Sequence, residues 1–128
     1  MFTLQQAEAL LPQVRDELLA MQSLKAEIDV LRGALAHAVE RSAGNGHVHS
    51  EDALDAQRRR AEDLVGQLND RLARLNAWGV ELKGLDEGLI DFPSERDGRV
   101  VYLCWKLGED RIAFWHELDT GFANRQPL

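Results

Sequence analysis

The side chains with the widest chemical repertoire gather in the last third of the chain. Cys104, the one cysteine of the sequence, and His116 lie in β-prone segments that strand pairing could bring side by side. A cysteine thiolate beside a histidine is a nucleophile arrangement, and cysteine, histidine and carboxylate together form a zinc ligand set. The candidate ligand-binding residues in this region are Asp91, Cys104, Trp105, Glu109, His116, Glu117 and Arg125.

The same residues have a purely structural interpretation. A buried cysteine packs as a small apolar side chain, and Cys104 fits that description. His116 and Arg125 could hold the C-terminal tail through hydrogen bonds to nearby carboxylates. The sequence therefore leaves three alternatives for this cluster, namely packing, a ligand or anion pocket, and catalysis, and it assigns no catalytic residue.

A second group with metal-binding chemistry lies between two helical segments. His47 and His49 are separated by one residue, so in an extended segment both imidazoles point the same way, and neutral imidazole binds Zn, Ni or Cu. Such a pair needs a third donor, from Glu51 or from a second copy of the chain. Incidental loop polarity is the alternative. His47, His49 and His116 are the candidate metal ligands, and a divalent transition metal is the one candidate cofactor.

Composition and charge argue against several classes of function. The net charge is −7, so the chain is a poor partner for a phosphate backbone, and nucleic-acid binding is not expected. No window approaches about 18 uninterrupted apolar residues, so no membrane span is predicted. The lone cysteine and a start without signal-peptide character predict a cytoplasmic protein. Phosphate-binding glycine loops, paired-histidine protease helices and repeated CxxC pairs are missing, which argues against the common nucleotide, metalloprotease and zinc-ribbon roles.

The elements that must position these residues begin with a helical half, residues 3–78. Thr3 and Gln6 have the spacing of a capping box, so a helix is predicted to begin at about Leu4. Pro12 removes one backbone donor, which predicts a bent helix or a short helix joined to a long one, ending near Arg41. Apolar residues recur in steps of three and four, as one face of a helix requires: Leu11, Val14, Leu18, Met21, Leu24, Ile28, Leu31 and Leu35.

A second helix is predicted after a loop at 42–46. Ser50 can cap this helix, and Gly79 is a natural stop just beyond Trp78. A short loop makes the two helices antiparallel neighbours, and such a hairpin buries one stripe of each helix. Leu19 and Val30 fall outside that stripe and need another surface, either the rest of the chain or a second copy. A homo-oligomer, with a dimer favoured, is the expectation, and packing within one chain is the alternative.

From residue 79 the apolar period changes from 3.6 to 2, which predicts strands. The predicted strands are 80–83, 88–92, 99–106 and 112–116, with the second closed by Pro93, and tight turns such as Asp97-Gly98 make neighbouring strands antiparallel. One face of this sheet is expected to pack on the helices. The aromatic residues could stack a ligand, but a small sheet on two helices needs them for its core: Tyr102, Trp105, Phe114 and Trp115.

Several short motifs at the two ends of the chain have a familiar form. They are Phe2-Thr3 leading to Glu8-Ala9-Leu10-Leu11-Pro12, then Gly88-Leu89-Ile90-Asp91-Phe92-Pro93, Leu103-Cys104-Trp105 with Gly108-Glu109, and Trp115-His116-Glu117 with Gly121-Phe122 and Arg125. Together they resemble an uncharacterised bacterial family, Domain of Unknown Function 2203. The resemblance implies one domain of this architecture, and it supplies no reaction.

The patterns together predict an α+β fold in a single domain, residues 1–128. A long antiparallel helical hairpin, 1–78, precedes a small antiparallel β-sheet of three to four strands with a C-terminal tail, 79–128. The leading functional hypothesis is a small interaction or scaffold protein that self-associates through its helices, and a coiled-coil partner role rests on the long helices alone. The alternative hypothesis is a metal- or small-molecule-binding protein, or an enzyme, whose site lies in the β half.

Overall fold

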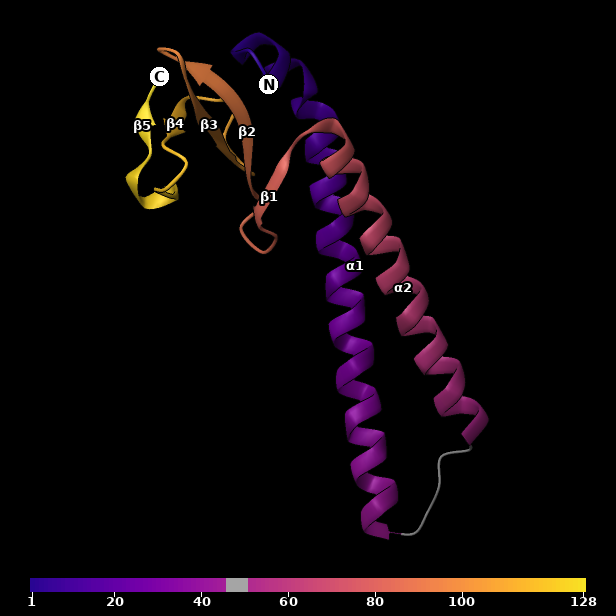
Figure 1. Cartoon of the computed structure of the whole chain (residues 1–128). Coiled ribbons are helices and arrows are strands. Elements are labelled where there is room, and N and C mark those ends of the chain that lie inside the picture. Colours follow the sequence, from indigo (N-terminus) through magenta and orange to yellow (C-terminus); the bar gives the residue numbers. More distant parts are fainter. Residues whose placement is uncertain (46–50) are drawn as a thin grey trace.

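A computed structural model shows a long helical hairpin with a curved sheet beside one of its ends (Figure 1). It describes residues 1–45 and 51–128, and for residues 41–45 it describes the backbone alone. The helices are α1 (Leu4–Asn45) and α2 (Glu51–Trp78), and a short 3-10 helix, η1, spans Phe122–Asn124. The strands are β1 (Glu81–Gly84), β2 (Leu89–Arg96), β3 (Arg99–Lys106), β4 (Phe114–His116) and β5 (Gln126–Pro127).

Helix α1 begins as the capping box predicts. The backbone N–H of Gln6 donates to Thr3 Oγ1 at 3.1 Å, and the backbone N–H of Thr3 donates to Gln6 Oε1 at 2.9 Å. The helix then runs through Pro12 as one element, so a short helix joined to a long one is wrong. The predicted end near Arg41 is also wrong, because α1 continues to Asn45 through most of the expected loop.

The hairpin is tied together by a buried carboxylate as well as by its apolar stripe. Glu17 of α1 is buried and accepts hydrogen bonds from Arg71 (3.0 Å) and Arg74 (2.6 Å) of α2. Helix α2 ends at Trp78, and Gly79 follows with a φ of +89°, as predicted for a helix stop. The predicted cap Ser50 lies outside the described residues.

The five strands form one antiparallel sheet in the order β1-β2-β3-β4-β5, so each strand pairs with its neighbours in the sequence. Asp97 and Gly98 both have positive φ, as the two central residues of a tight hairpin turn require. The sheet agrees with the predicted antiparallel arrangement and adds one short strand, β5, in the tail. Pro93 does not close β2, because that strand continues to Arg96.

The two faces of the sheet have different surroundings. The inner face shares one core with α1 as far as Met21 and with the C-terminal part of α2 from Leu68, and its large buried residues include Phe92, Leu103 and Trp105. Tyr102 and Cys104 alternate with these residues along β3 and therefore point to the outer face, away from the helices. The hairpin extends well beyond the sheet (Figure 1). No helix in the described part of the chain is long and apolar enough to cross a membrane.

Candidate functional site

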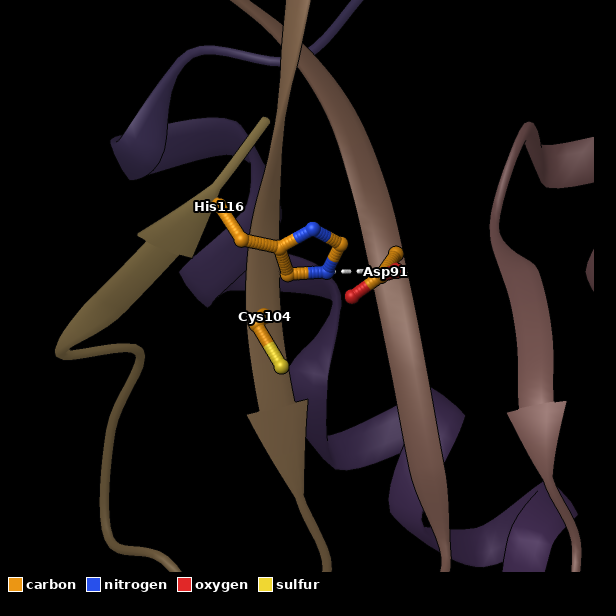
Figure 2. A group of neighbouring side chains, drawn as sticks. All are labelled: Asp91, Cys104 and His116. Carbon is orange, nitrogen blue, oxygen red and sulfur yellow. Dashed lines mark hydrogen bonds and ion pairs between the residues drawn. The ribbon is translucent and has the colours of Figure 1, made fainter. Parts of the chain in front are cut away.

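Strand register brings three predicted site residues to one place on the outer face. Asp91 of β2 is the register partner of Cys104 of β3, and His116 of β4 pairs with Tyr102, two positions from Cys104. All three side chains are buried, with Cys104 fully inaccessible to solvent. Their potential metal-ligand atoms lie within 4.8 Å of one another. Figure 2 shows the three side chains converging from three adjacent strands.

The closest contact in this cluster joins Asp91 and His116. His116 Nε2 lies 2.9 Å from Asp91 Oδ2 (Figure 2). The other imidazole nitrogen, Nδ1, lies 2.7 Å from the backbone carbonyl oxygen of Glu117. A carbonyl oxygen accepts and cannot donate, so Nδ1 must carry a proton. Nε2 is therefore the imidazole nitrogen that faces the Asp91 carboxylate.

A proton must lie between Nε2 and the Asp91 carboxylate in the absence of any other ligand. Either the imidazole is doubly protonated or Asp91 is itself protonated, because a bare nitrogen and an ionised oxygen would repel at this distance. Burial raises the pKa of Asp91 above its usual value, although His116 opposes that change. Asp91 Oδ1 is buried, and no donor in the described chain meets it in hydrogen-bonding geometry. The carboxylate is thus only partly satisfied.

Cys104 lies beside the Asp91 carboxylate as a protonated thiol. Burial, followed by the nearby charge of Asp91, raises the pKa of the thiol to about 12. Both imidazole nitrogens of His116 have other partners, so neither is placed to take the thiol proton. A nucleophile needs a thiolate or an adjacent base. The arrangement therefore does not support the catalytic cysteine that the sequence left open.

Arg125 and Glu109 meet at the edge of this cluster. Arg125 donates to Glu109 Oε1 at 3.1 Å and to Oε2 at 2.7 Å, and the backbone N–H of Lys106 also donates to Oε1 at 2.8 Å. Burial alone would raise the pKa of Glu109, but these hydrogen bonds outweigh it and lower the pKa. The pair anchors the C-terminal tail, as the structural interpretation predicts.

The remaining predicted residues lie elsewhere. Trp105 is buried on the inner face of the sheet, and its indole N–H donates to the backbone oxygen of Glu109 at 3.0 Å. The Glu117 side chain pairs with Arg99, and only its backbone carbonyl contacts His116. His47 and His49 lie outside the described residues. The structure thus brings together Asp91, Cys104 and His116, with Arg125 and Glu109 beside them.

Sequence reasoning missed a polar layer that covers His116 from the β1 side. The Tyr102 ring lies 5.4 Å from the His116 ring, and its hydroxyl donates to Glu81 Oε1 at 2.9 Å. The ammonium of Lys83 lies 4.6 Å from the centre of the Tyr102 ring. The alternation of β1 places Glu81 and Lys83 on one face, which is the only sequence signal for this layer. Their distance from His116 depends on the order of the strands.

A separate apolar hollow lies against the inner face and does not include the cluster. It has a volume of about 490 Å³ and lies between the N-terminal segment and the exposed end of the sheet, beside Trp115. None of Asp91, Cys104 and His116 lines it. The cluster is therefore enclosed by side chains, and this hollow gives it no opening.

A comparison with models of protein families shows which family the chain belongs to. The family model described as an uncharacterized conserved protein, DUF2203, matches residues 1–128. The chain belongs to the DUF2203 family. This membership agrees with the motif resemblance and covers the full length, including the helical middle where the motifs gave no signal. No curated protein and no solved structure matches the chain. The function of this DUF2203 member must therefore be argued from its own residues.

Proposed function

We propose that this protein binds a divalent transition-metal ion, with zinc preferred, through Asp91, Cys104 and His116. The observation that carries the proposal is a buried set of three potential ligand atoms within 4.8 Å of one another, in which Asp91 Oδ1 has no hydrogen-bond partner in the described chain. An unpartnered buried oxygen costs about 1–3 kcal/mol, and a bound cation would remove that cost.

The donor set suits zinc in chemistry and in size. Zinc takes Cys, His and Asp ligands at about 2.0–2.3 Å, so tetrahedral ligand atoms lie about 3.3–3.7 Å apart. The 2.9 Å between His116 Nε2 and Asp91 Oδ2 is somewhat shorter, and small side-chain rotations would open it. One ionised carboxylate and one thiolate balance the charge of a divalent ion, which a buried site requires.

The second hydrogen bond of His116 also supports metal binding. Histidine ligands of metals usually donate their other ring N–H to a carboxylate or a backbone carbonyl, which fixes the tautomer and the orientation of the ring. The Glu117 carbonyl holds His116 Nδ1 in this way at 2.7 Å. The Nε2 lone pair is thereby directed at the place where Asp91 and the ion would meet.

Binding would replace protons by the metal ion, and the charges balance. The ion displaces the proton of the Asp91–His116 pair and the proton of the Cys104 thiol, and both protons go to solvent. We expect the release of about two protons per ion bound. Three protein ligands leave one coordination position for water or another small ligand.

Titration of chelator-treated protein with Co²⁺ and Zn²⁺ tests the proposal. The expected result is one ion per chain, a thiolate-to-cobalt charge-transfer band, and a heat of zinc binding that depends on the ionisation enthalpy of the buffer. Cys104→Ser should abolish the band, and Asp91→Asn should weaken binding. His37→Gln, a change at an exposed histidine of α1, is the matched control and should bind as the wild type does.

Two outcomes would contradict this assignment. A protein that binds neither ion and gains no thermal stability from either one has no such centre. A protein whose binding is abolished by His47→Gln with His49→Gln, and is unchanged by Cys104→Ser, binds metal through the loop histidines instead.

Self-association through the helices is a second candidate function, and one observation favours it. Leu19 and Val30 of α1 are 49% and 72% exposed. They lie eleven residues apart and therefore point in nearly the same direction on the helix. The β half contacts α1 as far as Lys25, through core residues such as Met21 and the hydrogen bonds of Gln22, and it leaves Leu19 and Val30 exposed. A second copy of the chain is the proposed occupant.

Light scattering of the purified protein tests this second candidate. We expect a dimer at tens of micromolar, and we expect Val30→Glu to convert it to a monomer while leaving the fold unchanged. Glu27→Gln, which changes an exposed residue near this face, is the control. A wild-type protein that is a monomer at these concentrations would rule out the second candidate.

A further inference from the structure

The Arg125 guanidinium is held rigidly beside the outer face of the sheet. It makes a two-pronged ion pair with Glu109, and its central carbon lies 4.0 Å from the centre of the Phe114 ring and 4.2 Å from that of Phe122. The Arg125 side chain is only 15% exposed. The planar fork with Glu109 and the two rings together fix the plane of the guanidinium.

This clamp places Arg125 against Cys104. Phe114 is the register partner of Cys104, so the guanidinium that covers the Phe114 ring lies next to the thiol. Arg125 lies close enough to the thiol to oppose the rise in its pKa, and Cys104 in turn contributes to the raised pKa of Arg125. Glu109 occupies two of the five N–H donors of the guanidinium, which leaves others for the sulfur.

We infer that Arg125 is a positioning residue of the metal centre and donates an N–H to the Cys104 thiolate once the ion is bound. This inference rests on the proposed function. The C-terminal segment would then be a functional part of the site, because Arg125 is the residue by which that segment reaches the sulfur. A hydrogen bond to a ligating thiolate stabilises its charge and reduces the electron density that it gives to the metal.

A purely structural role for Arg125 predicts something different. If the residue only anchors the tail, its loss should lower stability and leave the electronic character of the sulfur unchanged. The energy of the thiolate-to-cobalt band separates the two roles, because it reports on the sulfur and not on the free energy of unfolding. A thiolate without its N–H donor is more electron-rich, so its band moves to lower energy.

The experiment compares Co²⁺-loaded wild type with Arg125→Met, Arg125→Lys and Arg99→Met. Arg99 is the matched control because it forms a similar two-pronged pair with Glu117 on the same sheet and lies away from Cys104 in the register. We expect Arg125→Met to lose about 10- to 100-fold in metal affinity and to shift the band to lower energy. Arg125→Lys should shift it by less, and Arg99→Met should leave it unchanged.

The outcomes distinguish this inference from the proposed function. If both Arg125 variants keep the wild-type band energy and the wild-type affinity for Co²⁺, the inference is overturned and the proposed metal centre is unaffected. A wild-type protein without a thiolate band overturns both. If Arg125→Met does not fold, Arg125→Lys decides the question, and a wild-type band in that variant counts against the inference.

Discussion

Asp91 and His116 lie on strands that do not touch, yet their side chains are 2.9 Å apart. Strand β3 separates them, and strands two positions apart in a sheet are about 9.6 Å from each other. The two side chains therefore reach across the outer face from opposite sides of β3, above Cys104. This contact is the centre of the candidate site, and it defines what the imidazole can do.

The first prediction concerns the tautomer of His116. Because the Glu117 carbonyl accepts from Nδ1, that nitrogen should remain protonated both with and without metal. Nitrogen chemical shifts of the histidine rings check this. Zinc should move the Nε2 resonance strongly and the Nδ1 resonance little. A metal-dependent shift at Nδ1 would show that the ion binds on the opposite side of the ring.

The second prediction concerns the reactivity of Cys104 in metal-free protein. With a pKa of about 12, roughly one thiol in ten thousand is ionised at pH 8, and the sulfur is also buried. Alkylation by iodoacetamide should therefore be at least about 100-fold slower in the folded protein than in urea. Mass spectrometry over time measures both rates. Similar rates in the two states would restore the cysteine nucleophile as a serious alternative.

The third prediction concerns Glu17 and acid stability. Burial tends to raise the pKa of Glu17, but the hydrogen bonds from Arg74 and Arg71 outweigh it, so the pKa is lowered from 4.5. A lowered folded-state pKa stabilises the protein above the unfolded value, and this contribution is lost as the pH falls through the folded-state pKa. Glu17→Gln should cost about 1–3 kcal/mol at pH 7.

The pH dependence provides the check on Glu17. In urea titrations the difference between wild type and Glu17→Gln should shrink as the pH falls below about 4.5, where the unfolded carboxylate becomes protonated. Glu27→Gln removes a longer, exposed pair with Arg60 at 3.6 Å and should change stability by less than about 0.5 kcal/mol. An equal loss in the two variants would mean that the Glu17 pair adds nothing beyond surface charge.

The fourth prediction concerns Gly88, which directly precedes β2 and accepts a backbone hydrogen bond from Leu107, the residue that directly follows β3. Gly88 has a φ of +66°, and a Cβ added there would lie 2.5 Å from Leu107 Cβ. Gly98 has a φ of +78°, with nothing within 4 Å of an added Cβ. Gly98→Ala should therefore cost about 1 kcal/mol of backbone strain, and Gly88→Ala should cost about 1–3 kcal/mol more. Urea unfolding of both variants measures the difference.

A result in which Gly98→Ala is the more damaging of the two would show that the turn, and not the contact with Leu107, limits stability.

Metal titration of folded Gly88→Ala adds a second readout. Gly88 lies three residues before Asp91 and accepts a hydrogen bond from the Leu107 backbone N–H at 2.9 Å. A shifted register in this variant should therefore also weaken metal binding.

The sequence by itself determined the elements and their faces, because both follow from local rules. The spacing of three and four residues between apolar positions from Leu11 to Leu35 specifies a helix, and the capping box of Thr3 and Gln6 specifies its start. Alternation along β3 places Leu103 and Cys104 on opposite faces of the sheet. The predicted end of α1 near Arg41 was wrong because the backbone of 42–45 continues the helix despite Gly44 and Asn45. The continuation of β2 past Pro93 also escaped prediction.

Only the tertiary structure decided which polar residues meet. Seven residues of the β half had suitable chemistry, and spacing alone could not show that Asp91, Cys104 and His116 converge while Trp105 and Glu117 turn elsewhere. Which side chains converge depends on the order and register of three strands, because a register shift of one residue moves a side chain to the other face of the sheet. Strand pairing between distant segments, and not local propensity, therefore created the candidate site.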